Sequence, residues 1–321
     1  MSTTSQEALQ RVNFFVVGAA KCGTTTLYTR LSRHPEVFLS PLKEPNFYSR
    51  ADLDPARFSK AFKSNTKLDL TDYLAKDDPL PERQVGFVRD ESDYARLFSG
   101  ATDAHRVVGE CSTSYLWSPS APEALHAAHP QAKVVVALRD PVDRIYSHYL
   151  MARKYGFVKG SVVEAVKADL AHPDPSWGRS ELFVELSLYE AQIARWRALF
   201  PDSQLRILEP GALRRDETWH DLQTWLGLTP RDLTSGPGTG DANTAGLSRY
   251  EGLNRWLTST GLKQALGRLV PSGLKSSLLG WYYRSDAVPT LTTAERAELT
   301  ALLAKVSGSE TYCKKTSGQG F

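Results

Sequence analysis

The sequence predicts an α/β protein in three layers, a sandwich in which a central parallel sheet lies between helices. Two apolar, β-branched runs, Phe14–Gly18 and Lys133–Leu138, are typical of buried parallel strands. Each run is followed by residues with helical spacing, so strands alternate with helices. With 321 residues, 41% hydrophobic and 23% charged, the composition is that of a globular protein. We therefore expect one domain over residues 1–321, with residues 1–11 and 313–321 as loose termini.

The other expected elements follow in order along the chain. The first helix begins near Thr24 and stops at His34-Pro35, where we expect His34 to have a capping role. Asp140 is the expected N-cap of a later helix, with Pro141 at its first position. The remaining expected strands are Glu36–Leu39, Val107–Glu110 and Leu205–Leu208, and the remaining expected helices are Glu181–Phe200, Trp219–Leu226 and Ala294–Val306.

Charge, cysteine and apolar patterns exclude several classes of protein. The 39 Lys and Arg exceed the 36 Asp and Glu by only +3, too little to indicate a nucleic-acid partner. Cys22, Cys111 and Cys313 fit neither a disulfide framework nor a zinc motif, although one pair plus a free thiol stays open. The longest apolar runs fall far short of the ~20 residues that span a bilayer, and the polar start resembles no signal peptide. We expect a cytoplasmic protein without a membrane span.

The loop between the first strand and the first helix is suited to hold a phosphate. Gly18 and Gly23 have the spacing of a P-loop, but Thr24 stands where an ATP or GTP site requires lysine, and Lys21 lies inside the loop. Backbone N–H groups, the positive end of the helix and threonine hydroxyls can still bind an anion. The alternative is an ordinary tight turn with polar caps.

A second basic position follows the second strong strand. Arg139 is expected at the carboxyl end of a parallel strand, where such sheets bind ligands, and its planar guanidinium suits a phosphate. The alternative for Arg139-Asp140 is an ordinary salt-bridged helix start.

Both segments resemble the donor-binding motifs of sulfotransferases that use 3′-phosphoadenosine 5′-phosphosulfate (PAPS). Lys21-Cys22-Gly23-Thr24-Thr25-Thr26 looks like the 5′-phosphosulfate loop of that family, and the stretch from Arg139 to Tyr149 looks like its 3′-phosphate motif. The resemblance covers roughly residues 12–250 and assigns the 3′-phosphate to Arg139 and Ser147. It implies a P-loop-like fold, PAPS as donor and adenosine 3′,5′-bisphosphate (PAP) as product. No metal is expected, because the sulfuryl group carries little charge.

A third segment indicates the branch of the family. Lys43-Glu44-Pro45-Asn46-Phe47-Tyr48 resembles a stretch of the heparan sulfate and carbohydrate-type branch and its bacterial relatives, where the glutamate is the catalytic base. This assigns Glu44 as base, with Lys21 stabilising the leaving phosphate. Lys43 is either a second cation near the sulfuryl group or a solvated side chain. That branch often has a lysine where Cys111 falls, and Glu110 is a candidate to hydrogen-bond within the site or to orient Lys21.

Other assignments rest on weaker signals. Arg284 resembles a late basic residue that closes on the 3′-phosphate, and Cys313-Lys314-Lys315 is an alternative for that role. We interpret His148 as a packing residue. Residues 50–100 and 235–290 are expected to supply acceptor-site loops and a lid. Within the latter, residues 261–283 suit a lid, a membrane-surface helix or an ordinary buried helix.

We therefore predict a PAPS-dependent sulfotransferase that acts on a hydroxyl of a carbohydrate, a glycolipid or a hydroxylated natural product. Two alternatives stay open, a P-loop-like nucleotide kinase or NTPase and a non-catalytic nucleotide-binding module. Peripheral contact with a membrane is compatible with the sequence, which favours no oligomeric state.

Overall fold

The structure is a computed structural model of the 321-residue chain, and it describes residues 3–66, 68–235, 247–248, 283–284 and 289–308. The chain forms two compact units. The first comprises residues 1–53, 68–140 and 189–242, and the second comprises residues 54–67, 141–188 and 243–321. The expected single domain therefore stays a prediction.

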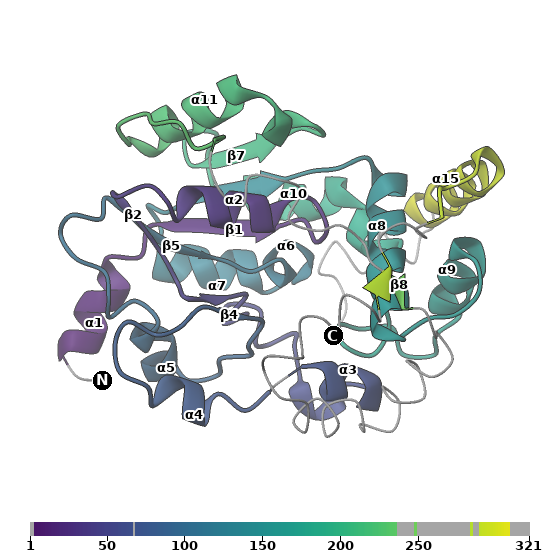
Figure 1. The fold of residues 1–321 in the computed structure, drawn as a ribbon, viewed down its shortest axis with the longest axis horizontal. Coiled ribbons are helices and arrows are strands. Elements are labelled where there is room, and N and C mark those ends of the chain that lie inside the picture. The colour runs from purple at the N-terminus through teal and green to yellow at the C-terminus, as the bar shows by residue number, and fades with distance from the viewer. Residues whose placement is uncertain (1–2, 67, 236–246, 249–282, 285–288, 309–321) are drawn as a thin grey trace. The chain divides into compact units, whose positions relative to one another are not determined.

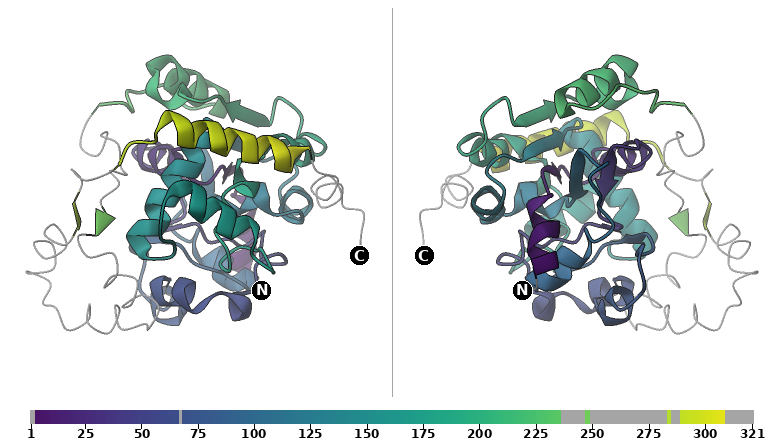
Figure 2. Two further views of the ribbon diagram at one scale, coloured as in Figure 1. Left: turned by 90° about the vertical axis from the view of Figure 1, so that its right-hand side faces the viewer. Right: turned by 90° about the vertical axis from the view of Figure 1, so that its left-hand side faces the viewer.

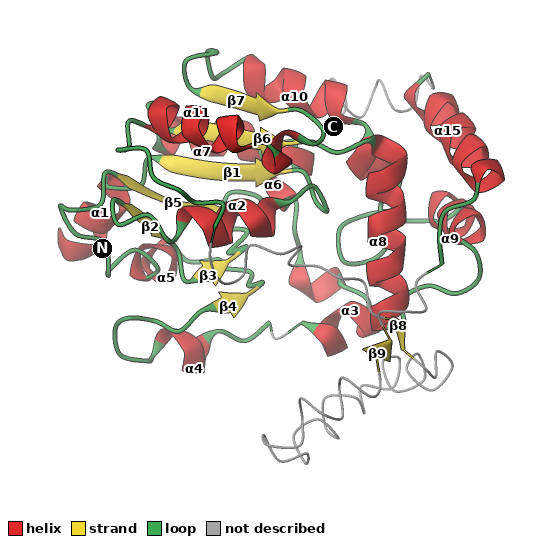
Figure 3. Ribbon diagram, turned by 45° about the horizontal axis from the view of Figure 1, so that its top comes forward, coloured by secondary structure: helices red, strands yellow, loops and turns green. Residues whose placement is uncertain are grey.

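A five-stranded parallel sheet lies at the centre of the first unit. Its strands are β1 (Phe14–Gly18), β2 (Val37–Leu39), β5 (Val107–Cys111), β6 (Lys133–Ala137) and β7 (Leu205–Leu208). They lie in the order β2-β5-β1-β6-β7, and their arrows run the same way in Figure 3. The predicted strands and the α/β class are confirmed. Because the strand order reverses direction beside β1, the carboxyl end of β1 is the expected ligand position in such a sheet.

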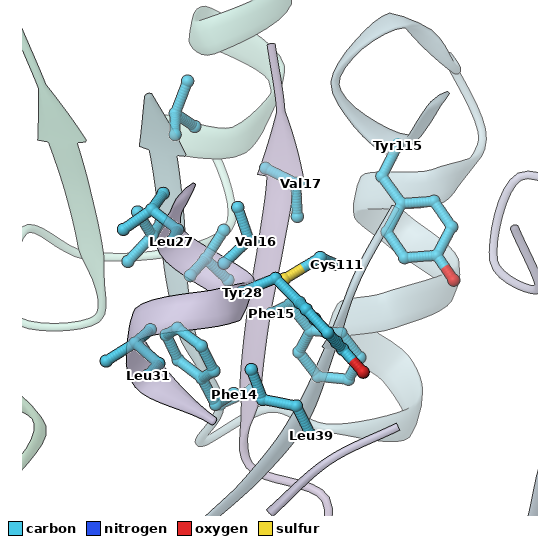
Figure 4. Packing of buried hydrophobic residues seen from close by; sticks show 14 of the residues in the cluster. Phe14, Phe15, Val16, Val17, Leu27, Tyr28, Leu31, Leu39, Cys111 and Tyr115 are labelled. Carbon is cyan, nitrogen blue, oxygen red and sulfur yellow. The ribbon is translucent and has the colours of Figure 1, made fainter. Parts of the chain in front are cut away.

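Helices cover β1 from both sides, which explains why all five of its residues are buried. Figure 4 shows Phe14 of β1 beside Leu31 of α2 (Thr24–Leu31), on one side of the sheet. Tyr115 of α6 (Ser114–Trp117) lies on the other side. A strand between two helical layers can be apolar at every position, and this produces the continuous apolar run seen in the sequence.

Three further helices of the first unit extend these two layers, and they are α7 (Ala121–Ala128), α10 (Tyr189–Arg197) and α11 (Asp216–Leu226). The guanidinium carbon of Arg30 on α2 lies 4.7 Å from the ring centroid of Trp219 on α11, so these helices share a layer. Arg195 Nη2 of α10 donates to the Leu116 carbonyl of α6 at 3.2 Å in the opposite layer. The predicted three-layer sandwich is confirmed (Figure 1).

Short elements complete the chain before β5. They are β3 (Leu42–Lys43), paired in parallel with β4 (Arg83–Gln84), and the helices α1 (Thr3–Gln10), η1 (Pro55–Arg57), α3 (Lys60–Asn65), α4 (Thr71–Leu74) and α5 (Glu91–Arg96). The expectation of a loose segment over residues 1–11 is wrong for α1. This helix, purple in Figure 2, lies beside α5 because Ala8 and Leu9 pack on the hydrophobic core.

The second unit has a hydrophobic core of its own. Besides η1 and α3, the described part of this unit contains α8 (Pro141–Tyr155), α9 (Val162–Leu170), η2 (Glu185–Ser187), β8 (Leu247–Ser248), β9 (Tyr283–Arg284) and α15 (Thr293–Ser307). Ile145 of α8, Val166 of α9 and Leu299 of α15 are fully buried in this core. The helices predicted at Pro141 and at residues 294–306 are confirmed. In the part of the chain that the structure describes, no helix is long and apolar enough to cross a bilayer.

The helix predicted over Glu181–Phe200 is shorter than expected. The Asp169 carboxylate accepts hydrogen bonds from the backbone N–H groups of Glu181 at 2.7 Å and Phe183 at 2.8 Å, and Leu182 has φ +51°. The left-handed conformation of Leu182 interrupts the helix despite the apolar spacing, and the Asp169 carboxylate holds the backbone on either side of it. Regular helix begins only at Tyr189, the first residue of α10.

His34 does not cap α2. That helix ends at Leu31 with Ser32 as its C-cap, and His34 lies beyond it, buried. His34 Nδ1 accepts the backbone N–H of Glu36 at 3.1 Å, and its Nε2 lies 2.8 Å from the Thr229 carbonyl. Both ring nitrogens therefore order the turn that leads into β2.

Candidate functional site

The predicted phosphate loop joins β1 to α2. Gly23 is the N-cap of α2 with φ +89°, and no side chain caps this end. The first backbone N–H groups of a helix have no carbonyl partner within it, so they are available to an anion. A Cβ at position 23 would lie 2.7 Å from Leu213 Cδ1, and the local conformation therefore requires glycine. The hydroxyl-bearing Thr24 is buried at this end, and Thr25 and Thr26 are half-buried.

Two side chains within the loop have different surroundings. Lys21 is half-buried and has φ +68°, a left-handed conformation that is unfavourable for a residue with a Cβ. Such strain concentrates at functional sites. Cys22 is buried, and its Sγ lies 3.5 Å from the Tyr189 hydroxyl. Cys22 and Cys111 are both free thiols, while Cys313 lies outside the described residues.

Arg139 follows the strand beside the phosphate loop. The backbone N–H of Ala19, at the start of the loop, donates to the carbonyl of Ala137 at the end of β6, at 2.8 Å. Arg139 comes two residues later and is half-buried. The two segments predicted from the sequence therefore leave the sheet side by side, where a ligand of an α/β sheet binds.

Other predicted phosphate ligands belong to the second unit. Ser147 is half-buried on α8, and Arg284 is part of β9, with its side chain outside what the structure describes. Their proximity to Arg139 stays a prediction. Cys313-Lys314-Lys315 and residues 261–282 lie outside the described residues.

Glu44 leaves the same edge of the sheet, one strand away from the phosphate loop. It follows β3, and its backbone N–H donates to the Cys111 carbonyl at the end of β5, at 2.8 Å. Cys111 pairs with Val16 of β1, two residues before Gly18. Because neighbouring parallel strands end at one edge, Glu44 and the loop that contains Lys21 both lie at the carboxyl end of the sheet.

Both carboxylate oxygens of Glu44 have partners. Lys43 Nζ lies 2.8 Å from Oε1, and the Thr113 hydroxyl donates to Oε2 at 3.1 Å. The Glu44 side chain is nevertheless 17% exposed, whereas that of Lys43 is 2% exposed. Of the two interpretations of Lys43, a solvated side chain is therefore wrong. The carboxylate is fixed in orientation yet accessible from one side.

The protonation of Lys43 reflects two opposing effects. Burial is the largest single influence and lowers the pKa of the Lys43 ammonium group, but Glu44, Cys111 and Glu110 together outweigh it, and the pKa of Lys43 is raised. The charged form of Lys43 is therefore favoured beside the Glu44 carboxylate. The ion pair fixes the Glu44 side chain at its Oε1.

The turn that carries Glu44 has an unusual backbone. Glu44 has φ +63° and Asn46 has φ +56°, so two residues with side chains adopt the left-handed conformation around Pro45. The Glu44 carbonyl accepts hydrogen bonds from Asn46 Nδ2 at 2.8 Å and from the backbone N–H of Gly86 at 2.9 Å. These contacts hold the strained conformation.

A buried carboxylate, Glu110, is connected to this turn. Its Oε2 accepts from the Ser112 hydroxyl at 2.7 Å, and its Oε1 accepts from the hydroxyls of Tyr94, at 3.2 Å, and Tyr115. Burial raises the pKa of Glu110 to about 7 although these hydroxyls oppose the shift. Of the two roles considered for Glu110, hydrogen bonding within the site is the one the structure shows.

His148 packs inside the second unit, as predicted. Its ring lies 4.9 Å from that of Phe183, and its Nε2 lies 3.2 Å from Glu181 Oε2. Burial raises the pKa of Glu181 to about 7. Among the residues that the structure describes, no group of three or more His, Cys, Asp or Glu side chains is arranged to hold a metal ion.

Comparisons with known proteins cover the segments that form this site. The family model described as "Sulfotransferase family" matches residues 13–207, which include the phosphate loop, Glu44 and Arg139. Carbohydrate sulfotransferase 15 of Rattus norvegicus is 33% identical over 253 residues, a match that covers 68% of this chain and 44% of that protein. The bifunctional heparan sulfate N-deacetylase/N-sulfotransferase 3 of Homo sapiens is 28% identical over 222 residues, covering 68% and 22%. The chain thus spans less than half the length of these relatives.

A solved structure is similar over most of its length. The sulfotransferase from Alicyclobacillus acidocaldarius is 28% identical and has a TM-score of 0.55 with this chain. The match covers 80% of this chain and 96% of that one. The similarity supports the P-loop-like arrangement of the sheet and its helices.

Proposed function

The chain belongs to the sulfotransferase family, and on that premise we propose that it transfers a sulfuryl group from PAPS to a hydroxyl group of a carbohydrate. The carbohydrate is favoured over a glycolipid or a hydroxylated natural product by the names of the two curated relatives, one a carbohydrate sulfotransferase and the other a heparan sulfate enzyme. The observation that carries the proposal is the fixed and accessible Glu44 carboxylate, at the same sheet edge as the phosphate loop.

PAPS is the donor substrate in this proposal, and the loop fits its 5′-phosphosulfate. The uncapped N-terminus of α2 offers N–H groups, and Gly23 keeps the approach free of a Cβ. The family resemblance assigns contacts with the 5′ end to Lys21, Cys22 and the threonines 24–26. It assigns the 3′-phosphate to Arg139, Ser147 and Arg284.

The proposed reaction is an in-line displacement at sulfur. Glu44 accepts the proton of the acceptor hydroxyl while the hydroxyl oxygen forms a bond to sulfur. The bond between sulfur and the 5′-phosphate oxygen breaks, and its electron pair stays on PAP. Lys21 and the loop N–H groups stabilise the charge that develops on this oxygen. Lys43 holds the Glu44 carboxylate in place through their ion pair, and the sequence of steps needs no metal ion.

Replacing the proposed base tests the proposal. Glu44→Gln keeps the shape of the side chain but removes its ability to accept a proton, so transfer from radiolabelled PAPS should fall by ~10²-fold or more. The acceptors are desulfated heparan and chondroitin chains and simple glycosides. Binding of PAP, measured as a rise in melting temperature, should be nearly unchanged, because Glu44 is assigned to the acceptor.

A matched control variant distinguishes an effect at the site from a general effect of removing a glutamate charge. Glu123 is an exposed glutamate on α7, and Glu123→Gln should leave both transfer and PAP binding at the wild-type level. Near wild-type transfer by Glu44→Gln would contradict the role of Glu44. Absence of transfer from the wild-type enzyme to every carbohydrate tested would contradict the acceptor class.

A further inference from the structure

The turn that carries Glu44 is connected to Glu110 by a continuous chain of hydrogen bonds. Ser112 Oγ donates to Glu110 Oε2 at 2.7 Å and accepts the backbone N–H of Asn46 at 3.0 Å. Asn46 Nδ2 in turn donates to the Glu44 carbonyl at 2.8 Å. The fully buried carboxylate thus reaches the backbone of the proposed base through two residues.

We propose that Glu110 is a positioning residue for Glu44, which holds through Ser112 and Asn46 the strained turn that aims the Glu44 carboxylate at the acceptor. This inference rests on the proposed function of Glu44 as base. Glu110 has no assigned contact with donor or acceptor, because its side chain is fully buried. It acts through the geometry of another residue.

The strain in the turn explains why such support is needed. Left-handed conformations at Glu44 and Asn46 each cost of order 1 kcal/mol or more and persist only where surrounding contacts fix them. Asn46 is the central contact, because its Nδ2 also donates to the Gly86 carbonyl at 2.8 Å and its Oδ1 accepts the Ser114 hydroxyl at 2.5 Å. With its own backbone N–H bound by Ser112, Asn46 is held at three points.

The direction of these hydrogen bonds requires an acceptor at position 110. A serine hydroxyl has one proton, and Ser112 uses it on Glu110, which leaves its lone pairs for the Asn46 N–H. Three hydroxyls donate to Glu110, from Tyr94, Tyr115 and Ser112. An ionised carboxylate accepts all three, whereas a glutamine would set an NH₂ group against at least one of them.

Lys43 also connects Glu44 and Glu110 electrostatically. Both Glu44 and Glu110 favour the charged form of Lys43, with Glu44 the stronger influence. Burial is the largest cause that raises the pKa of Glu110, the three hydroxyls oppose it, and the Glu44 charge adds the smallest contribution. The two carboxylates and Lys43 thus belong to one cluster at the carboxyl end of β5.

A double-mutant cycle on kcat tests positioning directly. Glu110→Gln should lower kcat for transfer from PAPS to the glycan acceptor by about 10- to 100-fold, the scale of a small misplacement of a reacting group. KM for PAPS and the PAP-induced rise in melting temperature should stay at the wild-type level. In the Glu44→Gln background, Glu110→Gln should lower kcat no further, because the residue through which it acts is gone.

A second variant and a control variant distinguish a positioning effect from simple destabilisation of the fold. Ser112→Ala removes the hydroxyl between Glu110 and Asn46 and should lower kcat about tenfold, again without effect beyond Glu44→Gln. Gln223 is equally buried and also makes three hydrogen bonds, with the Trp219 carbonyl and with the carbonyl and N–H of Arg231. Gln223→Met should lower the melting temperature but leave kcat per PAP-binding site unchanged.

The outcomes distinguish this inference from the proposed function. If Glu44→Gln alone keeps its activity, the base assignment fails, and the positioning inference fails with it. If Glu44→Gln is slow but Glu110→Gln and Ser112→Ala match the wild type, only the positioning inference is overturned. Multiplicative losses in the double variants, or a loss of PAP binding in Glu110→Gln, would overturn it as well, because either result shows an effect that does not pass through Glu44.

Discussion

Lys43 Nζ lies 2.8 Å from Glu44 Oε1, and it is the cation, not the carboxylate, that is sealed from solvent. Removing an ammonium group from water costs several kcal/mol, which a neighbouring carboxylate offsets only with good geometry. Such a pair contributes little to stability compared with an apolar substitute. Its value here is the fixed charge that it holds behind the Glu44 carboxylate.

Replacing this cation should weaken the proposed base without disturbing donor binding. Lys43→Met keeps the length of the side chain but removes the ion pair that fixes the Glu44 carboxylate at Oε1. Because the carboxylate is then held less well, we expect kcat to fall by roughly tenfold while the PAP-induced rise in melting temperature stays at the wild-type level. Lys167→Met, which removes an exposed lysine paired with Glu298, is the control. A wild-type kcat in Lys43→Met would show that Lys43 does not act on Glu44.

Two glycines in the left-handed region allow a matched test of the phosphate loop. Gly23 has φ +89° and a Cβ there would meet Leu213, whereas Gly211 has φ +83° and nothing within 4 Å of its Cβ position. Gly211→Ala should therefore cost only the conformational penalty of about 1–2 kcal/mol. Gly23→Ala should cost more and also weaken PAP binding. Thermal melting with and without PAP measures both effects, and equal PAP shifts in the two variants would contradict the role of Gly23.

The parts of the site that were predictable from the sequence are those with a local pattern. β1 and β6 are visible because helices bury them from both sides, and the phosphate loop follows from its glycine spacing. Glu44 could be assigned only through the family resemblance, because β3 spans two residues and has no periodicity. The Glu110 cluster depends on Tyr94, brought close by tertiary packing, which no spacing along the chain reveals.

The sequence-based prediction was wrong for the first half of the helix expected over residues 181–200. The apolar spacing of residues 181–200 is helical, but Leu182 adopts a left-handed conformation, and Asp169 binds the N–H groups of Glu181 and Phe183 on either side of it. Asp169 lies 12 positions before Glu181 and has no signature in the helix itself. A tertiary contact that holds an irregular backbone therefore accompanies the shortened helix.

The assignment of Arg139 predicts a preference among nucleotides. PAP carries a 3′-phosphate that AMP lacks, so PAP should raise the melting temperature of the wild-type protein markedly more than AMP at equal concentration. Arg139→Ala should remove most of this difference and leave the smaller AMP shift in place, because the loop after β1 binds the 5′-phosphate. Equal shifts for PAP and AMP in the wild type would contradict the donor assignment.

The last prediction concerns the pH dependence of stability that Glu110 contributes. Burial raises the pKa of Glu110 to about 7 in the folded protein, above the ordinary value of 4.5 for an exposed glutamate. Between these two values the folded state binds more protons than the unfolded state, so the free energy of unfolding falls as pH rises. At about 1.4 kcal/mol per pKa unit, the contribution lost between pH 4.5 and pH 7 is ~3 kcal/mol.

Glu110→Gln should remove this part of the pH dependence, because glutamine does not titrate. Urea unfolding at pH 5 and pH 8 should show the wild type losing ~3 kcal/mol more than the variant over that interval. Contributions from other groups, including Glu181, cancel in this difference between proteins. Glu110→Gln should therefore lose less stability than the wild type between pH 5 and pH 8, while it transfers sulfuryl groups more slowly. Parallel pH profiles of stability in the two proteins would show that Glu110 has an ordinary pKa. A faster or unchanged kcat in Glu110→Gln would show that the buried Glu110 has no effect on Glu44.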